Sequence, residues 1–204
     1  MSTLRVNTIK SLNESAGNPL TIDDSVVSSG SFVTNDGTNA QSIAFGTANS
    51  TTGVSAVSLA GTSNTASSFA ATLAGDNAHA VSFFSVAMGK NTEARGQASF
   101  AHGRDAQTSA SYAHAEGRET VAAGDYSHAE GYQTTSSGDY SHAEGSGTRA
   151  SGNYSHAEGT TNVASGNSSH AEGEGTTASG VGAHAEGQDT LAAGANAHAE
   201  GEGT

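Results

Sequence analysis

Residues 127–140 read Ser-His-Ala-Glu-Gly-Tyr-Gln-Thr-Thr-Ser-Ser-Gly-Asp-Tyr, and similar stretches come directly before and after them. The glycine of this stretch, Gly131, belongs to a column that recurs at every fourteenth position, after a first step that is longer by one. The column comprises Gly46, Gly61, Gly75, Gly89, Gly103, Gly117, Gly131, Gly145, Gly159, Gly173, Gly187 and Gly201. Such regular spacing is typical of a repeat protein, in which each unit is stabilised by stacking on its neighbours.

A second column of small residues lies midway between the glycines of the first. It comprises Gly53, Gly96, Gly124, Gly138, Gly152, Gly166, Gly180 and Gly194, with Ser68, Ser82 and Ala110 in the less regular units. Small residues at two points of each unit indicate two turns, and therefore two short strands per coil.

The residues between the turns alternate as they do in a β-strand. Ser127, Ala129 and Gly131 are expected to share one face of the first strand, and His128 and Glu130 the other. The small side chains indicate an inner face, and the polar ones an outer face.

The second half of the repeat alternates in the same way, with Thr120, Ala122 and Gly124 on one face and Val121 and Ala123 on the other. A helix would need apolar residues at positions i, i+3, i+4 and i+7, and these units do not supply them. A glycine at every seventh residue would also destabilise a helix by about 1 kcal/mol each time.

Large aliphatic side chains are too few after Arg104 for a conventional core, since only Val121, Val163, Val181 and Leu191 are present. Disorder is the alternative for such a composition, but disorder does not require a period. The sequence instead predicts an all-β solenoid whose two strands per coil lie back to back, with only Gly, Ala, Ser and Thr between them. Parallel pairing of successive coils would give a rod of roughly 50–55 Å.

Composition excludes several classes of function. The net charge is -13, and the seven basic residues are scattered, so no nucleic-acid-binding patch is expected. The absence of cysteine excludes disulfides and thiol catalysis. No signal peptide and no apolar stretch of roughly 20 residues is visible, so membrane insertion is not expected. No cofactor is expected either.

The repeats resemble the head repeat of trimeric autotransporter adhesins of the YadA type. The resemblance rests on Ser42-Ile-Ala-Phe-Gly46, Ser85-Val-Ala-Met-Gly89 and the serial Ser-His-Ala-Glu-Gly units, and it covers residues 41–204. It implies a left-handed parallel β-roll that associates as a homotrimer. Association through the outer columns is also expected because these are apolar in the early units, at Ile43, Phe45, Val86, Met88 and Phe100.

Residues 1–40 form a separate attachment segment and linker in this prediction. Residues 4–12 alternate like a strand, residues 13–18 have turn chemistry, and residues 19–23 return as a second strand of a hairpin-like adaptor. The stretches Leu4-Arg-Val-Asn-Thr-Ile-Lys10 and Pro19-Leu-Thr-Ile22 are similar to the N-termini of bacteriophage tail fibres. This similarity implies that residues 1–40 dock the chain onto a tail or baseplate protein.

The most prominent candidate site is a pair of outer columns. The histidines are His114, His128, His142, His156, His170, His184 and His198, and the glutamates are Glu116, Glu130, Glu144, Glu158, Glu172, Glu186 and Glu200. Stacked carboxylates repel one another, and neighbouring imidazoles relieve this by hydrogen bonding or by becoming charged, which predicts raised imidazole pKa values. Metal binding is an alternative. A structural polar ladder is favoured, because a dedicated site would be built once.

Two further columns have alternative interpretations. Tyr112, Tyr126, Tyr140 and Tyr154 are expected to stack on one another, with sugar stacking as the alternative. Thr120, Thr134, Thr148, Thr176 and Thr190 resemble an ice-binding array, but the alternation predicts that they lie on the inner face. No unique nucleophile or pocket-forming loop accompanies the His–Glu pairs, so neither catalytic nor metal residues are assigned and an enzyme is not expected.

Together these patterns predict a structural bacteriophage tail fibre in the virion, whose shaft reaches toward a host glycan or protein. One alternative is a fragment of a bacterial surface adhesin that binds matrix or glycan. Another is an appendage whose catalytic domain lies outside these residues. The last repeat is incomplete at Gly201-Glu-Gly-Thr204, which predicts a longer fibre or an end covered by another protein.

Overall fold

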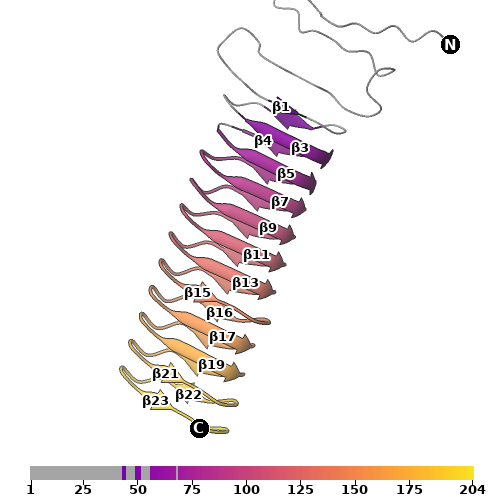
Figure 1. Cartoon of the computed structure of the whole chain (residues 1–204). Helices are drawn as coiled ribbons and strands as arrows, with labels where there is room; N and C mark the ends of the chain where they lie inside the picture. Colours follow the sequence, from indigo (N-terminus) through magenta and orange to yellow (C-terminus); the bar gives the residue numbers. More distant parts are fainter. Residues whose placement is uncertain (1–42, 45–48, 52–55, 68) are drawn as a thin grey trace, which may run out of the picture.

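The computed structural model describes residues 43–44, 49–51, 56–67 and 69–204, which form one continuous stack of coils (Figure 1). The described part of the chain contains strands and turns and no helix, and thus no helix that could cross a membrane. The all-β solenoid of parallel strands, with partners at every fourteenth position, is confirmed. The predicted hairpin-like adaptor and attachment segment, residues 1–40, lie outside the described residues.

Each coil contributes one strand to each of two parallel sheets. We call the sheet of 12 strands sheet A. Its strands are β1 (Ile43–Ala44), β3 (Val57–Thr62), β5 (Ala71–Asp76), β7 (Val86–Lys90), β9 (Phe100–Arg104), β11 (His114–Arg118), β13 (His128–Tyr132), β15 (His142–Ala143), β17 (His156–Thr160), β19 (His170–Glu174), β21 (His184–Ala185) and β23 (His198–Ala199).

The sheet of 11 strands, sheet B, carries the second strand of each coil. Its strands are β2 (Ser50–Thr51), β4 (Thr65–Ala66), β6 (His79–Ala80), β8 (Glu93–Ala94), β10 (Gln107–Thr108), β12 (Val121–Ala122), β14 (Thr135–Ser136), β16 (Arg149–Ala150), β18 (Val163–Ala164), β20 (Thr177–Ala178) and β22 (Leu191–Ala192).

The register of the sheets places equivalent residues of successive repeats beside one another. His114 pairs with His128, for example, and Val121 with Thr135. One irregularity lies between β5 and β7, where Ala71 pairs with Val86, fifteen positions later, but Gly75 pairs with Gly89, fourteen positions later. The register therefore shifts within the pairing of these two strands, which is how the rod accommodates an extra residue.

The interior of the rod is built from the small columns. Alanines such as Ala115, Ala129 and Ala143 on sheet A, and Ala122 and Ala150 on sheet B, have no exposed surface. Serines close the interior at the turn before sheet A. The hydroxyls of Ser141 and Ser155 are buried and donate to the carbonyls of Gly138 and Gly152 at the preceding turn. Small buried side chains thus fill the space between the two strands of a coil, as predicted.

Most described glycines of the first column differ from their predicted position, although Gly75 is buried as predicted. Gly131 is exposed rather than buried on the inner face with Ser127 and Ala129, and its φ is +104°. A Cβ at this position would lie 2.2 Å from the carbonyl oxygen of Gly145 in the next coil. Glycine is therefore required here by the backbone conformation and by the approach of successive coils, because an L side chain fits neither.

The turns of the rod have a regular backbone conformation that the residue types at these positions do not indicate. From Tyr112 onward every seventh residue is left-handed, with φ between 53° and 68°. These residues are Tyr112, Glu119, Tyr126, Gln133, Tyr140, Gly147, Tyr154, Thr161, Ser168, Gly175, Gly182, Asp189, Asn196 and Gly203. Only some are the Gly, Asn or Asp that favour this conformation, so the stacked coils impose it on the others.

Candidate functional site

The candidate site lies on the outer face of sheet A. We call it the His–Glu ladder, and define it as the seven histidines from His114 to His198 with the seven glutamates from Glu116 to Glu200. In each coil an alanine such as Ala129 points inward between His128 and Glu130, so strand alternation directs both polar side chains outward. The register then aligns each type in its own row along the rod.

The imidazole rings form one continuous stack. Successive ring centroids from His114 to His198 are 4.6 to 5.0 Å apart, and the ring planes are within 5° of parallel. On the N-terminal side of the stack, the ring of Phe100 lies 5.0 Å from that of His114 and is tilted by 31°. The spacing follows from the strand separation in a β-sheet, which is about 4.8 Å. The rings therefore cover one another's faces and leave their edges toward the glutamates.

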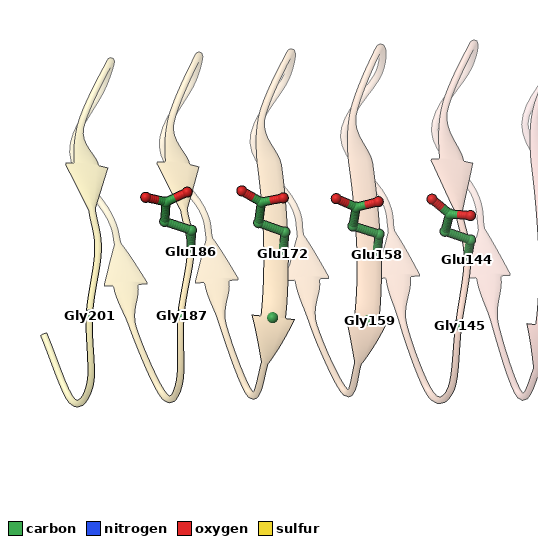
Figure 2. Close-up of a pocket in the computed structure, with 9 residues that line it drawn as sticks. Glu144, Gly145, Glu158, Gly159, Glu172, Glu186, Gly187 and Gly201 are labelled. Carbon is green, nitrogen blue, oxygen red and sulfur yellow. The ribbon is translucent and has the colours of Figure 1, made fainter.

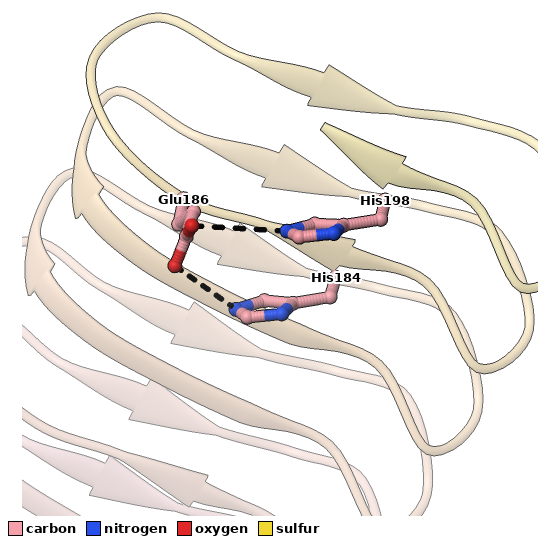
Figure 3. A group of neighbouring side chains, drawn as sticks. All are labelled: His184, Glu186 and His198. Carbon is pink, nitrogen blue, oxygen red and sulfur yellow. Dashed lines mark ion pairs between the residues drawn. The ribbon is translucent and has the colours of Figure 1, made fainter. Parts of the chain in front are cut away.

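The glutamates lie between successive histidines. Glu186 is 3.9 Å from the Nε2 atom of His184 through one carboxylate oxygen and 3.7 Å from that of His198 through the other (Figure 3). The shortest such separation on the ladder, between His184 and Glu172, is 3.4 Å. All of these exceed a normal N–H···O hydrogen bond. The carboxylates therefore neighbour the imidazoles without hydrogen-bonding them.

The predicted increase in imidazole pKa is wrong for three ladder histidines. The pKa values of His114, His142 and His170 lie below the ordinary value of 6.5. Burial in the stack is the main cause, because it removes water from the charged form, and repulsion by adjacent histidines acts in the same direction. The glutamates raise these pKa values but by less. The folded chain thus favours the neutral form of these three imidazoles.

A shallow groove runs beside the glutamates. It exists because the neighbouring column is glycine and contributes no side chain. Its best-formed part has a volume of about 670 Å³ and is lined by four carboxylates, Glu144, Glu158, Glu172 and Glu186, with the adjoining glycines (Figure 2). A second part continues toward His102 and shares Glu144 and Gly145 with the first. The groove is therefore a carboxylate-lined surface suited to cations.

The tyrosine column forms the expected ladder. The rings of Tyr112, Tyr126, Tyr140 and Tyr154 are 4.8 to 5.1 Å apart and within 6° of parallel. Their faces are therefore occupied by one another, which leaves the ring edges and hydroxyls for other partners. The pKa of Tyr140 is raised, first by desolvation and then by the neighbouring tyrosines and aspartates.

The threonine column is buried, as the alternation predicts. Thr120, Thr134, Thr148, Thr176 and Thr190 have at most 1% of their surface exposed, so they present no flat array to ice or to any other ligand.

The position of Glu130 and of Glu186, each between two histidines, was not predicted from the sequence. The signal is a double spacing, since Glu186 stands two positions after His184 in the same coil and twelve before His198 in the next coil. The spacing of twelve residues brings Glu186 close to His198 only because of the register in which successive coils pair, and that register is not known from the sequence.

No protein-family model matches this sequence, and no curated protein shows a significant match to it. The resemblance to YadA-type head repeats therefore rests on the repeat motif itself.

Proposed function

We propose that this chain is a structural protein of a bacteriophage tail fibre. Residues 1–40 attach it to the tail or baseplate, and the repeats of residues 41–204 form a stiff shaft that extends toward the host surface for adhesion. The protein performs no catalytic step in this proposal, and its role is to hold an attachment function at a fixed distance from the particle. Its location is the virion.

The uniformity of the rod is the observation that carries this proposal. The sheet A strands from β7 to β23 pair with an unchanged step from coil to coil, and the same inner alanine column recurs in every one of them. The backbone of each coil is hydrogen-bonded to the next at the strands and at the turns, for example from His128 to Ser141 and from Tyr126 to Ser111. A chain built in this way gains length and stiffness with each repeat.

The shaft is a homotrimer of left-handed rolls in this proposal, as in the YadA-type heads that its repeats resemble. Two features of single rolls support association. The outer face of sheet A carries partly buried apolar side chains in the early coils, including Val86, Met88 and Phe100. Nearby, Phe83 and Phe84 are 49% and 65% exposed and lie against each other at 6.5 Å. Burying such surface against a second copy is favourable.

Trimerisation would also serve adhesion. Three rods in one fibre present three copies of any distal binding surface, and a rigid connection keeps them at a high effective concentration near the host. The assignment to a tail fibre rests on the similarity of residues 4–10 and 19–22 to tail-fibre N-termini.

Electron cryomicroscopy of purified virions, combined with mass spectrometry of their proteins, tests the proposal. We expect the chain among the virion proteins and a thin rod of this repeat projecting from the tail. Light scattering of the purified chain should give a mass of three copies. A chain that is absent from particles and present on bacterial cells would support the surface-adhesin alternative, and a monomer at micromolar concentration would contradict the trimer.

A further inference from the structure

The His–Glu ladder contains five triads of potential metal ligands. Four consist of two glutamates from successive coils with the histidine between them in the chain. They are Glu116–His128–Glu130, Glu130–His142–Glu144, Glu144–His156–Glu158 and Glu158–His170–Glu172. The fifth contains two histidines and one glutamate, His184–Glu186–His198. In each triad the three ligand atoms lie within 4.8 Å of one another.

The histidine nitrogens that face the carboxylates have no hydrogen-bond partner among the described residues. The Nε2 atoms of His114, His128, His142, His156, His170 and His184 are buried and make no hydrogen bond. A polar atom that is shielded from water is normally satisfied, so an unpartnered nitrogen in six successive coils needs an explanation. The same nitrogen is the usual ligand atom of a neutral imidazole.

The distances between histidine Nε2 and carboxylate oxygen atoms within the triads are closer to those between two ligands of one metal ion than to those of a hydrogen bond. Zinc binds imidazole nitrogen and carboxylate oxygen at about 2.0–2.2 Å in tetrahedral geometry, which places neighbouring ligand atoms about 3.4 Å apart. The Nε2-to-oxygen separations are 3.5 Å for His156 with Glu144, 3.7 Å for His170 with Glu158 and 3.7 Å for His198 with Glu186. All three ligand atoms of a triad lie within 4.8 Å of one another, so side-chain rotations without backbone movement would complete the coordination.

We propose that the His–Glu ladder binds divalent transition-metal ions of the zinc type, each held by the three ligands of one triad. Imidazole and carboxylate together favour zinc, copper or nickel over magnesium or calcium, which prefer oxygen ligands alone. Three protein ligands leave a fourth position on the outer face of sheet A. That position takes water or a group from another molecule.

The sharing of glutamates limits how many ions bind tightly. Each neighbouring pair among the first four triads has one glutamate in common, such as Glu130. Ions in adjacent coils would lie about 4.8 Å apart and repel each other. At most two of these four triads can therefore be filled without sharing a ligand. The fifth shares none, which gives two plus one, or three, tight ions per chain.

The early coils supply an internal contrast. Val86 and Met88 occupy the register positions that His128 and Glu130 occupy later, and neither side chain can replace an imidazole or a carboxylate as a zinc ligand. The proposal therefore places all tight ions on the coils from Glu116 to His198.

Isothermal titration of the chelator-treated full chain with zinc chloride tests this inference, with metal analysis after dialysis. We expect three ions per chain. The triple variant Glu130→Gln, Glu144→Gln and Glu158→Gln removes a ligand from each of the first four triads and should reduce the number to one. A matched variant, Glu93→Gln, Glu119→Gln and Glu174→Gln, makes the same change in net charge away from the ladder and should still bind three.

Two further measurements exclude simple attraction of cations to an acidic rod. Binding in the presence of excess magnesium and high salt should persist, because screening weakens diffuse attraction much more than coordination. Cobalt(II) bound to the chain should give the visible absorption of a four-coordinate ion. Equal loss of ions in both triple variants, or displacement of zinc by magnesium, would overturn the proposal. Circular dichroism of the metal-free variants verifies that both remain folded.

Discussion

The coils that end at Arg104 carry Val86, Met88 and Phe100 on the outer face of sheet A, whereas the later coils carry histidine and glutamate at the same register positions. The interior does not change with the surface. Ala87 and Ala129 occupy one inner column, and both are fully buried. Inner columns and turns thus define the fold, while the outer columns are free to vary. Substitutions in the inner columns and turns should therefore have large effects on stability, and substitutions in the outer columns should have small effects.

The largest effect is expected where the backbones of successive coils leave no room for a side chain. In Gly180→Ala the new Cβ would lie 1.9 Å from the carbonyl oxygen of Gly194, so the coils must separate. We expect a loss of at least about 3 kcal/mol in the free energy of unfolding. Thermal unfolding followed by circular dichroism measures this loss.

Gly194→Ala is the matched control, because it belongs to the same column in the last coil and its Cβ would meet only the Cβ of Ala197, at 3.6 Å. This variant should lie within about 0.5 kcal/mol of the parent protein. Equal destabilisation by the two substitutions would contradict the view that contact between coils, rather than the turn itself, requires glycine.

A smaller effect is expected from the two buried asparagines, which occur once in each half of the described rod. Asn162 donates to the Gly173 carbonyl at 2.7 Å and to the Glu158 carbonyl, and its Oδ1 accepts from the Thr176 N–H at 2.8 Å. Asn64 bonds in the same pattern, to the Gly75 carbonyl and the Ala78 N–H, both at 2.9 Å.

Asn162→Ala should therefore destabilise the protein by about 2 kcal/mol, because it leaves buried backbone groups without partners. Asn162→Thr should lose less, since Thr148 and Thr176 occupy this column in the adjacent coils. Chemical denaturation measures both, and hydrogen exchange at the Thr176 amide should accelerate in each. Unchanged exchange at that amide would contradict the role of the Asn162 side chain.

Much of this scaffold was predictable from the sequence because its determinants are local and repeated. The glycine spacing, the alternation around Ala129 and the exclusion of large side chains led to the two-strand coil and the buried Thr120 column. The position of Gly131 was not predictable. Its exposure depends on a positive φ and on the next coil's carbonyl, and neither follows from alternation.

The chemistry of the ladder was harder to predict than its existence. The columns of His142 and Glu144 were apparent from spacing, but the direction of the pKa change was predicted from charge attraction alone. In the structure the stacked rings exclude water from one another, and this desolvation outweighs the glutamates at His142. Desolvation depends on ring-to-ring geometry, which a list of neighbouring charges does not contain.

The third prediction concerns the pH dependence of stability, which should arise from the histidine column of the later coils. The pKa values of His114, His142 and His170 are lower in the folded chain than the ordinary 6.5 expected on unfolding. Between these values the unfolded state binds more protons, so stability is constant above 6.5 and falls as the pH drops toward the folded pKa values. The melting temperature should therefore decrease on mild acidification.

The variant with His114→Asn, His142→Asn and His170→Asn is the control, and its melting temperature should depend less on pH over the same range. In the early coils this column carries Val86 and Phe100, which have no titratable group. A melting temperature that rises on acidification would contradict the neutral stack and favour charged imidazoles paired with glutamate.

The smallest effect is expected from exchanging the outer face itself. His142→Val combined with Glu144→Met transplants the side chains of Val86 and Met88 onto a later coil, at positions that are outward and partly exposed. The inner neighbour Ala143 and the turns are untouched, so the change in unfolding free energy should stay within about 1 kcal/mol. Circular dichroism should retain the parent spectrum. A loss of structure as large as that of Gly180→Ala would mean that the imidazole stack, and not the interior, holds the later coils together.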